Sequence, residues 1–296
     1  MPKRSPFRYP GGKTWFVPTF RKWMKARKRT STLLEPFAGG GIISLTAAFE
    51  NLAERAVLVE LDDNVAAVWT TIIQGDYLKL AKKILEFELS VRTAERALSR
   101  RPRSTLDHAF QTILRNRVSH GGIMAPGSGL TKTGEGGKGI SSRWYPETLA
   151  NRIVAIGAIR SKLEFVHGSA FDVIPEYLDD PCAALFIDPP YTAAGKRAGR
   201  RLYSNHQLDH DRLFDLVETA AADFLFTYDD SIEVRAKAAS HQMEIGFVPM
   251  KNTHHAKMQE LIIGRGLAWL GQFGSECGSK NVNVSDHAMS KPEAFR

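Results

Sequence analysis

The sequence is short of the features that mark several large classes of protein. It has only two cysteines, Cys182 and Cys277, in unlike surroundings, so neither a disulfide framework nor a zinc cluster is expected. Such scarcity fits a reducing cytoplasm. No run of about 18 apolar residues occurs, which argues against a membrane span. The basic start of the chain also lacks the apolar stretch of a secretory signal. We therefore expect a cytoplasmic protein.

Acidic residues are missing from stretches that are rich in lysine and arginine. Residues 1–30 and 192–204 contain no acid, and residues 100–150 carry a basic surplus. The whole chain has a formal net charge of +8 and a pI of about 9.5. Clustered positive charge predicts a polyanionic partner, most often nucleic acid. The alternative is a surface charge that serves solubility alone.

The pattern of apolar residues predicts an α/β protein with an insertion. Residues 32–75 read as two successive strand–turn–helix units, which favours a parallel sheet. Strand patterns return after residue 160. We predict a catalytic domain from residues 1–75 and 151–270, an inserted helical basic subdomain at 76–150, and a polar tail at 271–296. Within the insertion, residues 79–101 are helical in pattern, and 121–143 form a glycine-rich excursion.

The stretch RYPGGKT, residues 8–14, ends like a phosphate-binding P-loop but does not meet its requirements. A P-loop has a glycine five residues before its final Gly-Lys pair, follows a strand and opens a helix. Here the required glycine is replaced by Phe7, and the preceding proline-rich residues have no strand pattern. The stretch is left as a Gly-Gly turn between Tyr9 and Lys13.

A second glycine-rich stretch, EPFAGGG at residues 35–41, has the context of a nucleotide-cofactor loop. It follows an apolar strand and precedes a helix, and Glu60 ends the next strand. An acid in that place accepts hydrogen bonds from ribose hydroxyls. The alternative is a tight strand-to-helix turn. The pattern does not decide which nucleoside binds.

The stretch that points to chemistry is DPPY, residues 188–191, at the end of the apolar strand ALFI. Ligands of open α/β sheets bind beyond the carboxyl ends of the strands. The two prolines stiffen the turn and remove backbone donors. A carboxylate, a proline carbonyl and an aromatic ring suit a planar group with an exocyclic amine, positioned to attack a sulfonium methyl group. The alternative is a stiff turn without catalytic function.

FRYPGGK, EPFAGGG, VLVEL and DPPY, in this order, resemble the Dam-type adenine-N6 DNA methyltransferases of the α group. The resemblance covers about residues 5–265 and includes the segment LRNRVSHGG…SSRWYPETL. It implies a Rossmann-like class I S-adenosylmethionine-dependent methyltransferase fold with an inserted helical DNA-recognition subdomain. It further implies a site-specific enzyme from a bacterium or phage, as in restriction–modification systems, which methylates N6 of an adenine flipped out of duplex DNA.

The resemblance also implies roles for individual residues. The catalytic set is Asp188, Pro189, Pro190 and Tyr191. The set that binds S-adenosyl-L-methionine is Tyr9, Lys13, Phe37, Ala38, Gly39, Glu60, Phe171 and Asp188. The set that contacts DNA is Arg117, Lys132, Lys138, Arg143, Lys196, Arg197, Arg200 and Arg201. Gly121 and Ala125 replace the asparagine and arginine of GATC-specific members, so GATC specificity is not implied.

Other functions fit part of the sequence. The DPPY pocket also suits the adenine of RNA or N4 of cytosine, and a non-catalytic nucleic-acid binder could keep the same fold. The basic insertion favours duplex DNA. His254 and His255 are adjacent on a strand and point to opposite faces, so no metal site is predicted. A monomer or a weak dimer is expected.

Overall fold

The centre of the protein is a seven-stranded sheet. The computed structural model describes residues 3–8, 12–122, 129–134, 137–190, 208–251 and 257–274. The strands run in the order β3-β2-β1-β4-β5-β7-β6. They are β1 (Thr32–Glu35), β2 (Arg55–Glu60), β3 (Leu163–His167), β4 (Ala183–Ile187), β5 (Asp223–Asp229), β6 (Glu244–Lys251) and β7 (Lys257–Gly264).

The first five strands are parallel, and the hairpin of β6 and β7 adds an antiparallel edge. Leu34 of β1 lies opposite Val57 of β2 on one side and Leu185 of β4 on the other. Every residue of β1 and β4 is buried, as expected for central strands covered on both faces. The order 3-2-1-4-5 is that of a doubly wound Rossmann-type sheet. The predicted Rossmann-like α/β fold is confirmed.

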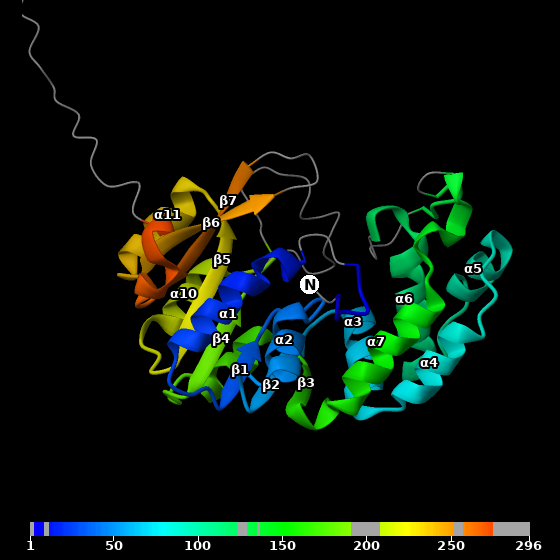
Figure 1. Cartoon of the computed structure of the whole chain (residues 1–296), viewed down its shortest axis with the longest axis horizontal. Helices are drawn as coiled ribbons and strands as arrows, with labels where there is room; N and C mark the ends of the chain where they lie inside the picture. The colour runs from blue at the N-terminus through cyan, green and yellow to red at the C-terminus, as the bar shows by residue number, and fades with distance from the viewer. Residues whose placement is uncertain are drawn as a thin grey trace, which may run out of the picture.

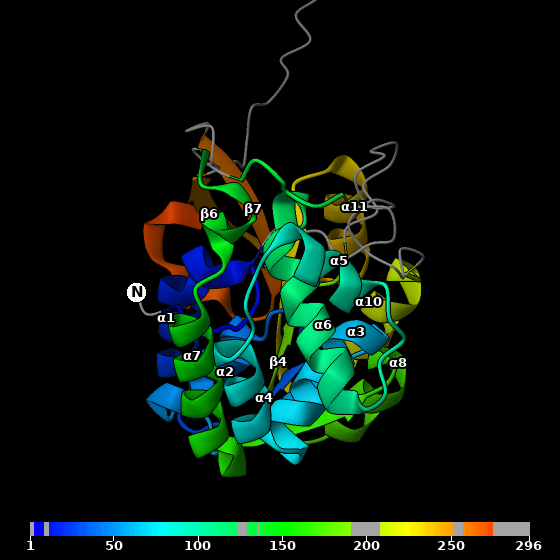
Figure 2. The same ribbon diagram turned by 90° about the vertical axis from the view of Figure 1, so that its right-hand side faces the viewer.

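Helices cover both faces of the sheet, and Figures 1 and 2 show α1 and α2 on one side and α8, α10 and α11 on the other. Side chains alternate between the two cores, because Leu58 of β2 packs on the first side and Val57 on the second. The helices of this region are η1 (Lys13–Phe16), α1 (Val17–Ala26), α2 (Ile42–Glu50), α3 (Asp63–Trp69), η2 (Thr70–Gln74), η6 (Arg160–Lys162), α8 (Ala170–Val173), η7 (Ile174–Tyr177), α10 (His210–Glu218), α11 (Ile232–Ser240) and η8 (Leu267–Gly274).

A second group of helices lies beside the sheet, on the right of Figure 1. Its members are α4 (Tyr77–Leu85), α5 (Val91–Leu98), α6 (Thr105–Val118), η3 (His120–Gly122), η5 (Gly139–Arg143) and α7 (Pro146–Ala158). The helical pattern of residues 79–101 is divided between α4 and α5, because Ser90 caps the start of α5. Helix α7, which runs past residue 150, packs against α4. The domain boundaries at residues 76 and 150 stay a prediction.

The start of the chain runs between the sheet and this helical group (Figure 1). Arg4 pairs with Glu50 of α2 at 2.8 Å and donates to the Thr46 hydroxyl. On the other side, the Asn116 side chain of α6 accepts from the backbone N–H of Arg8 and donates to its carbonyl, both at 2.8 Å. The opening segment therefore joins the two parts of the molecule.

Among the residues that the structure describes, no helix is both long and apolar enough to cross a membrane.

Candidate active site

Two acids predicted for the site, Glu60 and Asp188, and a third, Glu35, lie at the carboxyl ends of neighbouring strands. Glu35 ends β1, Glu60 ends β2, and Asp188 follows β4. Strands β1 and β4 pair directly, and the chain leaves them toward opposite sides of the sheet order. Such a switch point is where open α/β sheets bind their ligands. The fold thus brings together acids that are far apart in the sequence: Glu35 and Asp188 are 153 positions apart.

Lys13 is the central charged residue at this end of the sheet, beyond the carboxyl ends of the strands. Its Nζ lies 3.1 Å from Asp188 Oδ1 and 2.5 Å from Glu260 Oε1 of β7. The Thr227 hydroxyl of β5 donates to the same Asp188 oxygen at 2.8 Å. Lys13 is 6% exposed and Glu260 is 2% exposed, whereas Asp188 is half-buried. The opening motif and DPPY are therefore in direct contact.

The Lys13 ammonium is held in its charged form. Burial tends to lower its pKa, but the neighbouring Asp188 and Glu260 carboxylates raise it, and the net pKa lies above the ordinary value. An enclosed ion pair is favourable only when hydrogen bonds satisfy its charges. Contacts with two carboxylates provide that condition here.

The loop between β1 and α2 has one position that only glycine can occupy. Gly41 has φ of 62°, and a Cβ there would lie 2.7 Å from the Trp69 ring and 2.8 Å from Leu58. The Trp69 indole N–H donates to the Gly39 carbonyl at 2.9 Å. The loop is thereby pressed against α3, with its backbone close to the end of β2.

Glu60 fastens this loop from the neighbouring strand. Its Oε2 accepts from the Gly39 N–H at 2.9 Å, while its Oε1 accepts from Leu61 and Asp62 N–H groups at 2.9 and 3.0 Å. Burial raises the pKa of Glu60, and these backbone donors oppose the rise. A carboxylate oxygen has two lone pairs. Within the described chain, Oε2 therefore retains capacity for another donor, such as a ribose hydroxyl.

Glu35 is a buried acid for which the sequence motifs predict no function. It is 4% exposed, and its Oε2 accepts from the Ser44 N–H at 2.8 Å. Burial is the main cause that raises its pKa to about 8, and the nearby Asp188 charge adds to the rise. Glu35 is therefore mostly protonated at neutral pH.

The other predicted residues of the site that the structure describes lie in the loop after β1, in α8 and directly after β4. Ala38 is buried, and its N–H donates to the Val59 carbonyl at 3.0 Å, while Phe37 packs against the second core. Phe171 of α8 lies under the Arg212 guanidinium, whose carbon is 4.6 Å from the ring centre. Pro189 is buried and Pro190 half-buried. The following predicted residues lie outside the described residues: Tyr9, Tyr191, Lys196, Arg197, Arg200 and Arg201.

Arg117, which the resemblance assigns to DNA, is buried. It is 5% exposed, and its Nη2 donates to the Pro6 carbonyl at 2.5 Å. Burial, with repulsion from Arg152 and Arg8, lowers its pKa to about 10. Arg152 of α7 similarly donates to the Ser5 carbonyl at 3.1 Å. Arg117 thus points from α6 toward the opening segment, and its contact with DNA stays a prediction.

The other predicted DNA residues of the insertion that the structure describes are less enclosed. Lys132 and Lys138 are exposed, and Lys132 lies 3.6 Å from Glu95. Arg143 is half-buried and donates to the Ser119 carbonyl at 3.5 Å. The two lysines are accessible to a phosphate, and their contact with DNA stays a prediction.

Sequence reasoning missed Glu260 and Thr227. Both belong to strands of the second half of the sheet, far along the chain from Lys13. A charged residue within the apolar run of MQELIIG was the available signal for Glu260, because charged side chains are rarely fully buried unless they are paired. For Thr227 the sequence contains no comparable signal.

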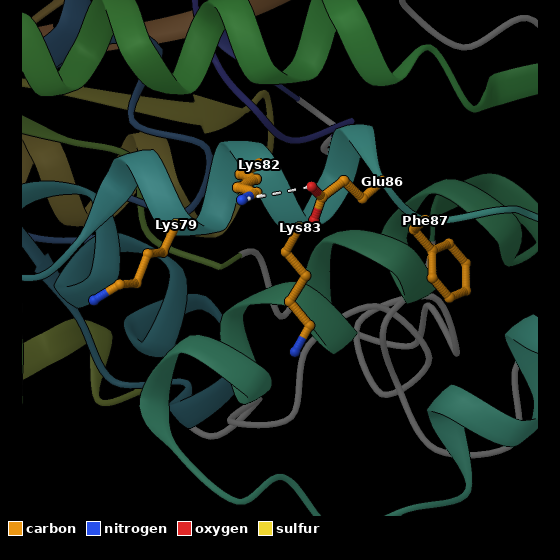
Figure 3. Close-up of a pocket in the computed structure, with 5 residues that line it drawn as sticks. All are labelled: Lys79, Lys82, Lys83, Glu86 and Phe87. Atoms are coloured by element: carbon orange, nitrogen blue, oxygen red, sulfur yellow. Dashed lines mark ion pairs between the residues drawn. The ribbon is translucent and has the colours of Figure 1, made fainter.

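A shallow cavity of about 290 Å³ lies on α4, at a distance from the strand ends. Figure 3 shows its lining of Lys79, Lys82, Lys83, Glu86 and Phe87. Lys82 pairs with Glu86 at 3.7 Å, and Lys83 pairs with Asp107. These contacts are those of a solvated helix surface. Across the described ranges, no cluster of histidine, cysteine and acidic residues could hold a metal ion.

Comparison with known proteins found no matching family model and no matching curated relative. Several solved structures are similar in fold. A SAM-dependent methyltransferase from Agrobacterium tumefaciens has 10% identity and a TM-score of 0.40, with 85% of this chain and 61% of that chain covered. A precorrin-6y C5,15-methyltransferase from Geobacter metallireducens has 9% identity and a TM-score of 0.39, with 87% of this chain and 93% of that chain covered. An rRNA methyltransferase from Streptomyces viridochromogenes has 13% identity and a TM-score of 0.35, with 89% of this chain and 90% of that chain covered. TM-scores this low carry no argument about function.

Proposed function

We propose that this protein is a DNA methyltransferase that transfers a methyl group from S-adenosylmethionine to N6 of an adenine in duplex DNA. The observation that carries the proposal is the contact of Lys13 with Asp188 at 3.1 Å, beyond the carboxyl ends of β1 and β4. It joins the opening motif to DPPY, the two most informative motifs of the sequence. The crevice next to this contact is the usual ligand site of such a sheet.

The residues present fit the cofactor. Glu60 offers an acceptor for ribose at the end of β2, and Gly41 keeps the neighbouring loop free of a side chain. Lys13 and the acids around it suit a zwitterionic amino-acid group, which carries one charge of each sign. When bound, S-adenosylmethionine supplies a sulfonium methyl group, whose bond to sulfur breaks with the electron pair staying on sulfur.

Asp188 and Pro189 are the groups that we assign to the target amine. The half-buried Asp188 carboxylate accepts a hydrogen from N6 and stabilises the positive charge that develops on this nitrogen. The Pro189 carbonyl accepts the second hydrogen. The nitrogen lone pair is then directed at the methyl carbon, and one N6 proton leaves through the carboxylate to solvent as the new bond forms. Positioning and electrostatics provide the acceleration.

Duplex DNA is the proposed partner because of charge and chemistry together. The net charge is +8, and the described insertion presents Lys132 and Lys138 on its surface. Counterion release makes such binding depend steeply on salt. An adenine must leave the stack to reach a crevice at a sheet edge, which costs roughly a few kcal/mol.

The test is transfer of a labelled methyl group to four substrates: duplex DNA, single-stranded DNA, structured RNA and single-stranded RNA. Mass spectrometry of the digested nucleosides identifies the modified base. We expect N6-methyladenine in duplex DNA, and mapping in a methylation-free host gives the recognition sequence. N4-methylcytosine or label in RNA alone would replace the substrate in this proposal. No label in any substrate, together with no heat of S-adenosylmethionine binding, would refute a methyltransferase.

A further inference from the structure

Glu260 is an enclosed carboxylate beside the proposed site that no motif of the sequence identifies. It lies in β7, is 2% exposed, and contacts Lys13 Nζ at 2.5 Å. Lys13 belongs to η1, at the other end of the chain, and also contacts Asp188. A buried charge without such a partner would be costly. The contact therefore fixes the position of the Lys13 ammonium.

The sheet explains why these side chains meet. Glu260 lies opposite Asp229 of β5, and Ile262 lies opposite Thr227. Since side chains alternate along a strand, Glu260 and Ile262 share a face, and Ile262 packs in the core on the α1 side. Thr227 reaches Asp188 from β5. Strands β5 and β7 together hold the Lys13–Asp188 pair from one side.

The arrangement has an electrostatic consequence for the reaction. Asp188 has to stabilise positive charge on an amine, but Lys13 places a positive charge 3.1 Å from its Oδ1. An uncompensated ammonium there would weaken the field that the carboxylate exerts on the amine. Glu260 contributes a second negative charge in contact with Lys13 Nζ, which offsets the ammonium. Lys13 can then orient Asp188 while the carboxylate keeps its negative potential.

We propose that Glu260 is a positioning residue for methyl transfer: it holds and neutralises Lys13, so that Lys13 and Thr227 fix the Asp188 carboxylate toward the target amine. The inference rests on the proposed function. It adds a residue of β7 to a site formed by the opening motif, the ends of β1, β2 and β4, and Thr227 of β5.

The titratable groups around Lys13 make the inference measurable. Asp188 and Glu260 both contact the ammonium, and both raise its pKa against the effect of burial. Glu35 from β1 and Tyr228 from β5 lie near Asp188; burial and the Asp188 charge raise the pKa of both. At neutral pH Glu35 is mostly protonated and Tyr228 is neutral, so a loss of the Glu260 charge should there act mainly on Lys13. The ionisation of Glu35 near pH 8 is common to the proteins compared.

The experiment compares Glu260→Gln with the unchanged protein in steady-state methyl transfer from pH 6 to about 10, the range set by the titrating groups. The substitution keeps the size of the side chain and removes its charge. We expect kcat to fall about tenfold or more, as for loss of a hydrogen bond to a charged group. In the unchanged protein the loss of the Lys13 charge lies above the ordinary pKa of 10.5, outside this range. We expect an alkaline limb to enter the range in Glu260→Gln, because burial and a single carboxylate then set the Lys13 pKa. An unchanged kcat profile would overturn the proposal.

Two further variants separate positioning from stability. Glu50→Gln removes another ion-paired carboxylate, on α2 and away from the site, where Glu50 pairs with Arg4 and Arg21. This control should lower the melting temperature without bringing an alkaline limb into the range. Glu260→Asp keeps the charge but retracts it, and should move the alkaline limb part of the way back to higher pH. Equal profiles for Glu260→Gln and Glu50→Gln would reduce Glu260 to a structural residue.

A measurement without substrate distinguishes this inference from the proposed function. Protein with ¹³C-labelled lysine is titrated by NMR, and the Lys13 signal is assigned by its loss in Lys13→Met. A lower Lys13 pKa in Glu260→Gln, or in Glu260→Asp if the first variant does not fold, supports the coupling even where no transfer is found. An unchanged Lys13 pKa in the folded variant overturns it, whatever the activity.

Discussion

Two buried cations of this protein, Lys13 and Arg117, are held in different ways. Lys13 lies at the sheet edge between two carboxylates, which raise its pKa. Arg117 lies in α6 and donates to a backbone carbonyl, while burial and neighbouring arginines lower its pKa to about 10. Lys13, paired with carboxylates, can orient the Asp188 side chain. Arg117, bonded to a backbone carbonyl, fixes the opening segment. Sequence motifs marked both residues as functional, and their surroundings distinguish them.

The largest expected effect concerns the carboxylate that Lys13 orients. Asp188→Asn keeps the shape of the side chain and removes its charge, so methyl transfer should fall by about 10²- to 10³-fold. Binding of duplex DNA, measured by fluorescence anisotropy, should change little. Labelled methyl transfer at saturating substrates gives the rate.

Asp180→Asn is the matched control. Asp180 precedes β4, at the amino-terminal end of the strand, and accepts hydrogen bonds from Ser31 and Cys182. Its kcat should stay within a few-fold of the original. If both variants transferred methyl groups equally well, Asp188 would have no catalytic role and the contrast with Arg117 would disappear.

The next effect is on stability. Arg117→Ala removes the donor to the Pro6 carbonyl and leaves a cavity under residues 5–8, so the free energy of unfolding should fall by about 2–4 kcal/mol. Arg117→Met keeps most of the volume and should lose less. Denaturant unfolding measures both.

Arg115→Ala is the control for charge, since Arg115 lies in the same helix and is only half-buried. It should leave stability nearly unchanged. A stable Arg117→Ala protein with weakened DNA binding would reverse the assignment and return Arg117 to the DNA interface.

A smaller effect concerns the pH dependence of stability. The pKa of Glu35 is about 8 in the folded protein and 4.5 ordinarily, so the folded state binds the proton more tightly. The stability from neutral Glu35 is complete below pH 4.5 and is lost as the pH rises toward 8. Glu35→Gln cannot ionise and should lack this loss.

The measurement is the difference in melting temperature between the two proteins from pH 5 to 8, with Glu35→Gln gaining relative to the original as the pH rises. Groups common to both proteins, such as His241 beside Asp215, cancel in that difference. A constant difference would mean that Glu35 ionises with its ordinary pKa of 4.5. Burial at the end of β1 would then not control its charge.

Local motifs predicted the parts of the site that depend on neighbouring residues. Glu60 and the glycine loop follow from a strand–turn–helix pattern, and DPPY follows an apolar strand. Glu260 could not be placed, because its contact with Lys13 depends on the antiparallel pairing of β5 and β7. Arg117 was assigned to DNA because the motif gives its position on α6, whereas its direction depends on packing against the opening segment.

The opening segment limits how freely parts of this protein could be exchanged. Ser5, Pro6 and Arg8 are bound by side chains of α6 and α7, and Arg4 is bound to α2. A helical group grafted in place of α4–α7 would therefore need matching groups at Asn116, Arg117 and Arg152. Without these groups, the graft would no longer hold the opening segment, which leads to Lys13 at the proposed site. An exchange of these helices should therefore include the first residues of the chain.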